Sequence, residues 1–285
     1  EALMDLQPWD YYDEQLQPKG NTSEIVAILE SVMARDPDHA GALHLYVHAV
    51  EASADPQRGV AAADRLRELI PGSGHLVHMP AHIYARVGRW HDAVIANQNA
   101  IEADDAYLAM CRGNVQGLYP LGYVPHNHHF LWFAASMGGA SAVARDAAQQ
   151  TAARVNLPEL MRQPGFAGLQ HYWMTPWFDR VRFGRWDEIA AEANPAPDLP
   201  YVTAIWHYAQ AMAALRQERP EDAANHYAAL STLAADPVME TQTVWDRYPL
   251  SHAVHIAERT VSAELALSRG DHRTAIAALR EAVLI

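Results

Sequence analysis

The feature that most constrains the fold is a short turn that recurs along the chain between stretches of helical pattern. Gly88 is followed by Arg89 and Trp90, and the same Gly-Arg-Trp order returns at Gly184. Apolar residues around these turns are spaced three and four residues apart, as in amphipathic helices. Alternating β-branched residues are nearly absent. The sequence therefore predicts an all-α protein made of antiparallel helix pairs joined by short turns.

The segment from His82 to Asp104 resembles a tetratricopeptide repeat (TPR), with a turn glycine, a following aromatic residue and small packing residues. In this interpretation Gly88 permits the turn, while Ala93 and Ala100 allow neighbouring helices to approach closely. Aligning the other turns on Gly88 gives intervals of 34, 51, 45, 34 and 52 residues. The aligned positions are Ala54, Gly139, Gly184, Glu218 and Gly270. We expect an irregular TPR-like α-solenoid forming a single domain over residues 1–285, with a lead-in segment over residues 1–20.

Histidines are concentrated in three segments of this pattern. They occur as His44-Leu-Tyr-Val-His48, as His75-Leu-Val-His78-Met-Pro-Ala-His82 and as His126-Asn-His128-His129. Neutral imidazole is the commonest protein ligand for transition metals, and two histidines four residues apart on a helix present both rings to one ion. The three segments together therefore indicate a metal site.

The histidines also keep a register relative to the turns. His44 and His48 lie 10 and 6 residues before the first turn position, as His78 and His82 do before Gly88. His129 lies 10 residues before the next turn, and the spacing of 13 residues is shared by His75, His126 and His171. First helices of such pairs line the concave face of a TPR-like array, so we expect the imidazoles on one inner groove.

Pro80 affects how the segment from His75 to His82 can fold into a helix. Its ring and missing N–H do not fit a helix interior between His78 and His82. Either a helix begins near Pro80, where a proline in the first turn is tolerated, or a kink changes the direction of His78.

Three stretches of the chain, at residues 38–53, 71–84 and 123–131, resemble a bacterial family of long, largely uncharacterised TPR proteins with His-rich inner helices. The resemblance extends over most of the chain and implies the TPR-like fold. It also implies that further helices precede and follow this segment in a longer array. His128 stands where the family pattern suggests an apolar residue.

Composition excludes several classes of function. With 34 acidic against 21 basic residues the net charge is -13, which argues against a nucleic-acid partner. No stretch is apolar and long enough to predict membrane insertion, and no signal sequence is recognisable. The chain begins at Glu1 without Met, so a soluble protein of either the cytoplasm or an exported compartment fits. Cys111 is the single cysteine, so any metal must use nitrogen and oxygen ligands.

The expected cofactor is thus a transition metal, with copper, iron and zinc as alternatives. Six histidines suit either one ion with spare ligands or two adjacent ions with three each. The candidate ligands are His44, His48, His75, His78, His82, His126 and His129. Glu51, three residues after His48, is the candidate catalytic residue, as a ligand, an orienting carboxylate or a general base. The candidate substrate-binding residues are Tyr46, Tyr84, Trp132, His171 and His207.

Two function classes remain open from the sequence. In the first, a metal-dependent enzyme uses the histidine-lined groove to polarise a substrate, activate water or handle oxygen. In the second, a non-catalytic TPR scaffold holds a peptide, a protein or a small molecule in the groove, and the histidines are polar contacts. No nucleophile elbow, phosphate-binding loop or His-Glu-x-x-His motif supports another enzyme class.

Overall fold

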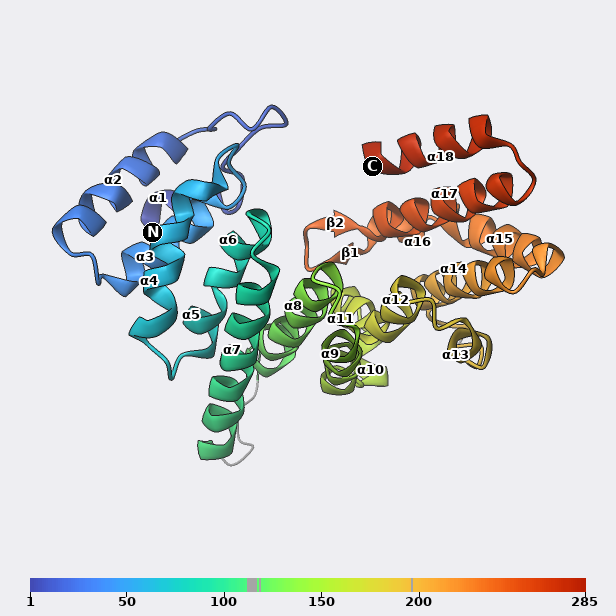
Figure 1. The fold of residues 1–285 in the computed structure, drawn as a ribbon, viewed down its shortest axis with the longest axis horizontal. Helices are drawn as coiled ribbons and strands as arrows, with labels where there is room; N and C mark the ends of the chain where they lie inside the picture. The colour runs from blue at the N-terminus through green and yellow to red at the C-terminus, as the bar shows by residue number, and fades with distance from the viewer. Residues whose placement is uncertain (112–116, 118, 196) are drawn as a thin grey trace. The chain divides into compact units, whose positions relative to one another are not determined.

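The computed structural model describes residues 1–111, 117, 119–195 and 197–285. These residues form an all-α structure with one pair of two-residue strands, which confirms the predicted fold class (Figure 1). They divide into two compact units, Glu1–Ala144 (unit 1) and Arg145–Ile285 (unit 2). Each unit is described by itself, and the single TPR-like array stays a prediction.

Unit 1 contains the lead-in segment and all three histidine-rich segments. Its elements are α1 (Ala2–Asp5), α2 (Thr22–Arg35), α3 (Ala40–Val50), η1 (Pro56–Gly59), α4 (Val60–Leu69), α5 (Gly74–His78), α6 (Pro80–Arg86), α7 (Trp90–Met110), η2 (Tyr119–Tyr123) and α8 (Val124–Met137). The core lies between α2, α3, α4, α6 and α7, and its fully buried side chains include Leu66, Ile83 and Tyr84. Helix α7 packs against α5, α6 and α8, so it connects the elements that carry the later histidines.

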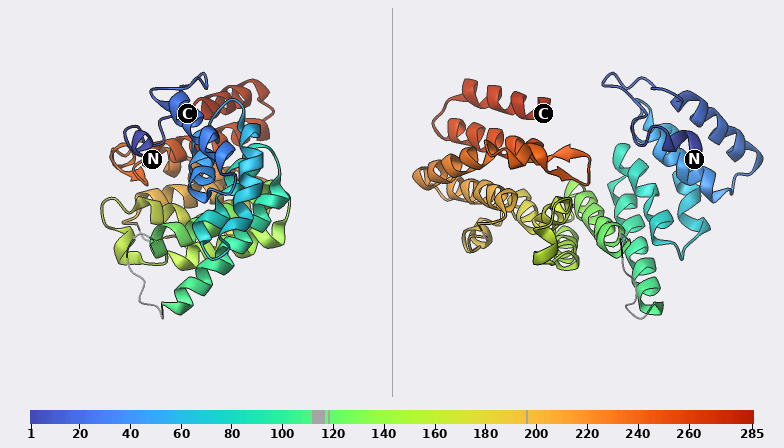
Figure 2. Two further views of the ribbon diagram at one scale, coloured as in Figure 1. Left: turned by 90° about the vertical axis from the view of Figure 1, so that its left-hand side faces the viewer. Right: turned by 180° about the vertical axis from the view of Figure 1, so that it is seen from behind.

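Unit 2 begins within α9 (Ser141–Arg154), which runs across the boundary. Its other elements are α10 (Pro158–Met161), α11 (Ala167–Trp173), α12 (Thr175–Arg182), α13 (Trp186–Ala190), α14 (Pro200–Arg216), α15 (Pro220–Ala234), α16 (Val238–Thr241), β1 (Thr243–Val244), β2 (Tyr248–Pro249), α17 (Leu250–Ser268) and α18 (His272–Leu284). Strands β1 and β2 pair antiparallel, with Val244 opposite Tyr248. Helices α14 and α15 form one pair, and α17 and α18 another, as the right-hand view of Figure 2 shows.

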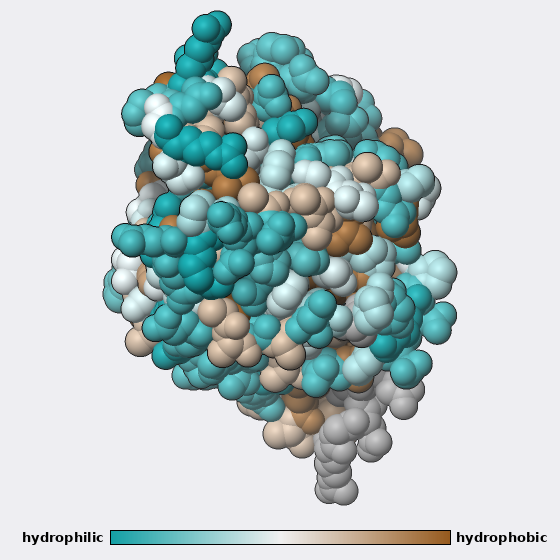
Figure 3. All heavy atoms as spheres, turned by 90° about the vertical axis from the view of Figure 1, so that its right-hand side faces the viewer, coloured by the Kyte–Doolittle hydropathy of each residue, from teal (hydrophilic) through white to brown (hydrophobic). Residues whose placement is uncertain are grey.

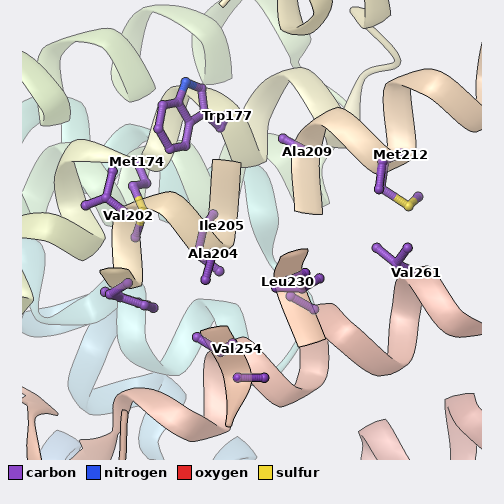
Figure 4. Close-up of a cluster of buried hydrophobic side chains, with 14 of the residues drawn as sticks. Met174, Trp177, Val202, Ala204, Ile205, Ala209, Met212, Leu230, Val254 and Val261 are labelled. Atoms are coloured by element: carbon purple, nitrogen blue, oxygen red, sulfur yellow. The ribbon is translucent and has the colours of Figure 1, made fainter. Parts of the chain in front are cut away.

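The core of unit 2 is built from small and branched side chains of α12, α14, α15 and α17. Met174, Ile205 and Leu230 are almost completely buried, and Figure 4 shows them converging with Val254 and Val261. Several alanines of α14 are also fully buried, which allows its neighbours to approach closely.

One outer face of the molecule is mainly hydrophilic, with small dispersed apolar areas (Figure 3). Among the described residues, no helix combines the length and the apolar character that a membrane crossing requires.

The predicted turn positions are confirmed at five of the six aligned sites. Gly88, Gly139, Gly184 and Gly270 have φ between 68° and 76°, and Glu218 has φ of 58°. At each of these sites the next residue donates its N–H to the carbonyl five positions earlier, as Arg89 does to Tyr84 at 2.8 Å. Such a hydrogen bond is typical of a helix that ends in a residue with left-handed backbone. The sixth site is different, because Ala54 is not left-handed.

The structure also decides between the alternatives at Pro80. Helix α5 ends at His78, Met79 follows, and α6 begins at Pro80, where the missing N–H costs no helical hydrogen bond. The expectation that a helix begins near Pro80 is therefore correct.

Gly74 at the start of α5 lies against Asp104 of α7, and a Cβ built at Gly74 would be 1.9 Å from Asp104 Oδ1. Only glycine permits this approach, which places the two histidines of α5.

Candidate metal centre

Three imidazoles from two helices form the first of two clusters, which we call triad 1. His44 and His48 lie one turn apart on α3, and His75 comes from the first turn of α5. The Nε2 atom of His44 lies 3.1 Å from His48 Nε2 and 3.1 Å from His75 Nε2. The start of α3 is fixed locally, because His39 Nδ1 accepts the N–H of Ala42. That cap fixes where α3 begins, and the four-residue spacing places His44 and His48 on one side of it.

Triad 2 repeats this arrangement one helix pair later. It consists of His78 at the end of α5, His82 in α6 and His126 in the first turn of α8. His78 Nε2 lies 2.9 Å from His82 Nε2 and 3.1 Å from His126 Nε2. Within each triad the candidate ligand atoms all lie within 4.8 Å of one another. The structure thus brings together six of the seven predicted metal ligands, in two groups of three.

The hydrogen bonds behind triad 2 fix the tautomers of two of its rings. Asn97 donates its amide N–H to Ala93, so its oxygen accepts from His78 Nδ1 at 2.7 Å. Glu51 Oε2 likewise accepts from His82 Nδ1 at 2.6 Å. A neutral imidazole with a proton on Nδ1 carries a lone pair on Nε2. In the neutral rings the Nε2 lone pairs of His78 and His82 therefore face each other at 2.9 Å, a contact that is stabilised by a proton on one ring or by a metal ion between the two.

A proton does not satisfy these clusters as well as a metal ion does. His78 Nε2 contacts two other Nε2 atoms, and so does His44 Nε2, yet one ring nitrogen makes only one hydrogen bond in its plane. A metal ion accepts all three lone pairs at about 2.0 to 2.1 Å, which separates the nitrogens by about 3.3 to 3.6 Å. Two of the three separations in each triad, at 2.9 to 3.1 Å, need to widen by a few tenths of an ångström, and the third lies within 4.8 Å. Both triads fit the donor set of a three-histidine metal site.

Electrostatics keeps four of the six imidazoles neutral and so available as ligands. Burial, followed by repulsion from neighbouring imidazoles, lowers the pKa of His44 to about 3, that of His126 to about 3 and that of His75 to about 4. The same causes hold the pKa of the fully buried His78 well below its usual range. Metal binding to these rings at neutral pH therefore displaces few protons.

Glu51 lies behind the rings rather than in front of them. Its Oε2 accepts from His82 Nδ1, while its Oε1 is 3.5 Å from His48 Nδ1. Burial raises the pKa of this carboxyl, but the imidazoles of His82 and His48 outweigh it and hold the pKa well below its usual range. Of the three predicted roles, this position matches an orienting carboxylate, because the side that carries Nε2 faces away from it.

The aromatic neighbours of the triads are not the ones expected from the sequence. Trp9 of the lead-in segment meets the His48 ring at 4.6 Å between centroids, and Tyr123 meets the His75 ring at 5.0 Å. Phe130 of α8 lies 5.1 Å from His78 and 5.0 Å from His82. No periodicity connects Trp9 to α3, because the contact depends on how the lead-in segment folds back.

Besides Glu51, four predicted residues of unit 1 lie outside the triads. Tyr46 and Tyr84 are core residues, with hydroxyls that donate to Glu30 and to Asp64. The His129 ring packs against the Trp132 ring at 5.2 Å between centroids. His129 is not a member of either group of three ligands, although it lies one turn after His126 on α8. The expected equivalence of His129 with His44 and His78 therefore does not extend to ligand geometry.

The remaining predicted residues belong to unit 2. His171 Nδ1 lies 2.8 Å from the Tyr201 hydroxyl, and burial lowers the pKa of His171 to about 4. His207 Nδ1 lies 2.9 Å from Nδ1 of His226 in the neighbouring helix. Among the residues described in this unit, no group of three potential ligands forms a metal site.

Comparison with models of known protein families found no match for this chain, and comparison with curated proteins found none either. The class of this protein is therefore defined by its fold and its site. It is an all-α protein with two three-histidine clusters at metal-binding distances.

Proposed function

We propose that this chain is a TPR-like protein that binds two transition-metal ions, one in each triad. The observation that carries the proposal is the pair of Nε2 lone pairs that His78 and His82 direct at each other. The similar contacts around His44 in triad 1 support it. Five left-handed turns at the aligned repeat positions support the TPR-like part of the proposal.

The donor chemistry favours copper, zinc or iron. Each triad offers three neutral imidazole nitrogens and no thiolate, which suits these metals and not magnesium or calcium. Three protein ligands also leave a coordination position free on each ion, the arrangement of catalytic rather than structural zinc sites. We therefore extend the proposal to a metal-dependent enzyme, in which the ions polarise a substrate, activate water or handle oxygen.

Elemental analysis of the purified protein, loaded separately with Cu(II), Zn(II) or Fe(II) and then dialysed, tests the metal sites. We expect two ions per chain for at least one of these metals. His75→Ala removes a partly exposed ligand of triad 1, and His126→Ala does the same for triad 2, so each variant should retain one ion. His129→Ala, on the same helix as His126, is the matched control and should retain two.

Circular dichroism of every variant distinguishes lost ligands from lost folding. A folded wild-type chain that retains no more of any of the three metals than a chelator-treated sample contradicts the proposal. That result would favour the scaffold that binds a peptide or protein partner.

A further inference from the structure

The two triads lie close enough together to act on one ligand. The rings of His48 and His82, from different triads, have centroids 6.0 Å apart, and those of His75 and His78 are 6.5 Å apart. Two rings within one triad, His48 and His75, are separated by 6.3 Å. Neighbouring rings across the boundary are thus about as far apart as these two rings of one triad.

Glu51 connects the two triads from behind. One carboxylate oxygen accepts from His82 and the other lies near His48, so a single side chain orients one ligand of each triad. The Glu51 side chain is only 19% exposed, which limits its freedom to serve either triad separately. The two ions would therefore be held at a fixed separation.

Charge indicates what else the centre needs. All six ligands are imidazoles, which contribute no negative charge, and among the described residues no carboxylate belongs to either group of three. Two divalent ions would bring four positive charges, against the single charge of Glu51. Charge enclosed in a partly buried site is costly unless it is compensated. Ions in two-metal sites are typically about 3.5 to 4 Å apart, a distance that one small anion spans.

We infer that the triads form one dinuclear centre whose ions share a small exogenous bridging anion of the hydroxide or azide class. This inference rests on the proposed function. The position free on each ion receives the bridge. His44, His75, His82 and His126 are partly exposed, which leaves a route for a small ligand, whereas His78 is fully buried behind Phe130.

Copper(II) is the probe that tests this, because imidazole sites bind it more tightly than other divalent first-row metals. Two Cu(II) ions joined by a bridging anion couple their unpaired electrons and lose their electron paramagnetic resonance signal. We expect the loaded protein to contain two copper ions per chain and far fewer unpaired spins than copper ions. Acid denaturation should restore the full Cu(II) signal, which shows that the copper was oxidised throughout. Titration with azide should change the visible spectrum and saturate at one azide per copper pair.

The half-site variants provide the matched comparison. His75→Ala and His126→Ala should each bind one copper ion with a full signal, because an isolated ion has no partner. Two bound copper ions with two full spins, before and after azide, overturn the inference and leave the two metal sites intact. Fewer than two copper ions in the wild-type chain also overturns the inference, and it contradicts the proposed function as well when the chain retains no zinc or iron either.

Discussion

His78 and His82 direct their Nε2 atoms at each other across 2.9 Å, although the other nitrogen of each ring already donates to an acceptor. Two lone pairs at that distance repel unless a cation separates them. The relationship depends on Asn97 and Glu51, two residues outside the triads. Their removal should therefore change metal binding without removing any ligand.

Asn97→Ala should weaken metal binding at triad 2. The change removes the acceptor that holds the proton on His78 Nδ1, so the ring is free to rotate or to place its proton on Nε2. Loss of such a partner typically costs about 10- to 100-fold in metal affinity. Competition with a chelator of known affinity measures the effect. Asn99→Ala, an exposed asparagine on the same helix, is the control, and equal affinities for the two variants would contradict the prediction.

Glu51→Gln should affect both triads. A glutamine side chain replaces one of the two carboxylate oxygens with an amide NH2, which cannot accept from His82 or face the His48 Nδ1–H, and it removes the negative charge behind the site. We expect each of the two binding steps to weaken by about 10-fold or more. Glu68→Gln makes the same charge change on the exposed side of α4 and should leave both steps unchanged. Weakening confined to one step would show that Glu51 serves a single triad.

Gly74→Ala should destabilise unit 1. The new methyl group would lie 1.9 Å from Asp104 Oδ1, so α5 has to move away from α7. Forcing extra atoms into a packed site typically costs about 1 to 3 kcal/mol. Gly72→Ala is the matched control two residues earlier, where a Cβ meets nothing within 4 Å. Urea unfolding of the metal-free proteins measures both, and indistinguishable midpoints would disprove the close approach.

His171 should make unit 2 sensitive to acid. Burial lowers its pKa to about 4 in the folded chain, whereas an unfolded histidine titrates near 6.5. The unfolded chain therefore binds more protons between these values, and stability falls as pH drops from about 6.5 to 4. His171→Gln should reduce the slope of unfolding free energy against pH in that window by up to about 1.4 kcal/mol per pH unit. His252→Gln, at an exposed position, should leave the slope unchanged.

Much of the fold could be predicted because its signals are local. Gly88, Gly139, Gly184 and Gly270 end helices where a left-handed residue is required, and flanking apolar spacing predicts the helices themselves. The spacing of His44 and His48 likewise places both rings on one side of α3 without knowledge of any neighbour. The prediction was wrong at Ala54, which is not left-handed, whereas Glu218, the other aligned position without a glycine, is left-handed.

The spacing of the histidines before the turns predicts the triads only when histidines from two successive repeats are combined. Each triad combines the histidines 10 and 6 residues before one turn with the histidine 13 residues before the next turn. His75 and His126 are therefore the equivalent third ligands, and His129 is not one. The next unit of the pattern has Phe133 at the position of His48 and His82, so it lacks the second histidine of the pair.

The sequence by itself determined the helices, their turns and the presence of paired imidazoles, because each depends on residues within a few turns of one another. Only the tertiary structure decided that six rings divide into two triads, that Glu51 stands behind both and that Trp9 covers His48. Those contacts join residues from different helices. They depend on how closely α3, α5, α6 and α8 pack, which local propensity does not specify.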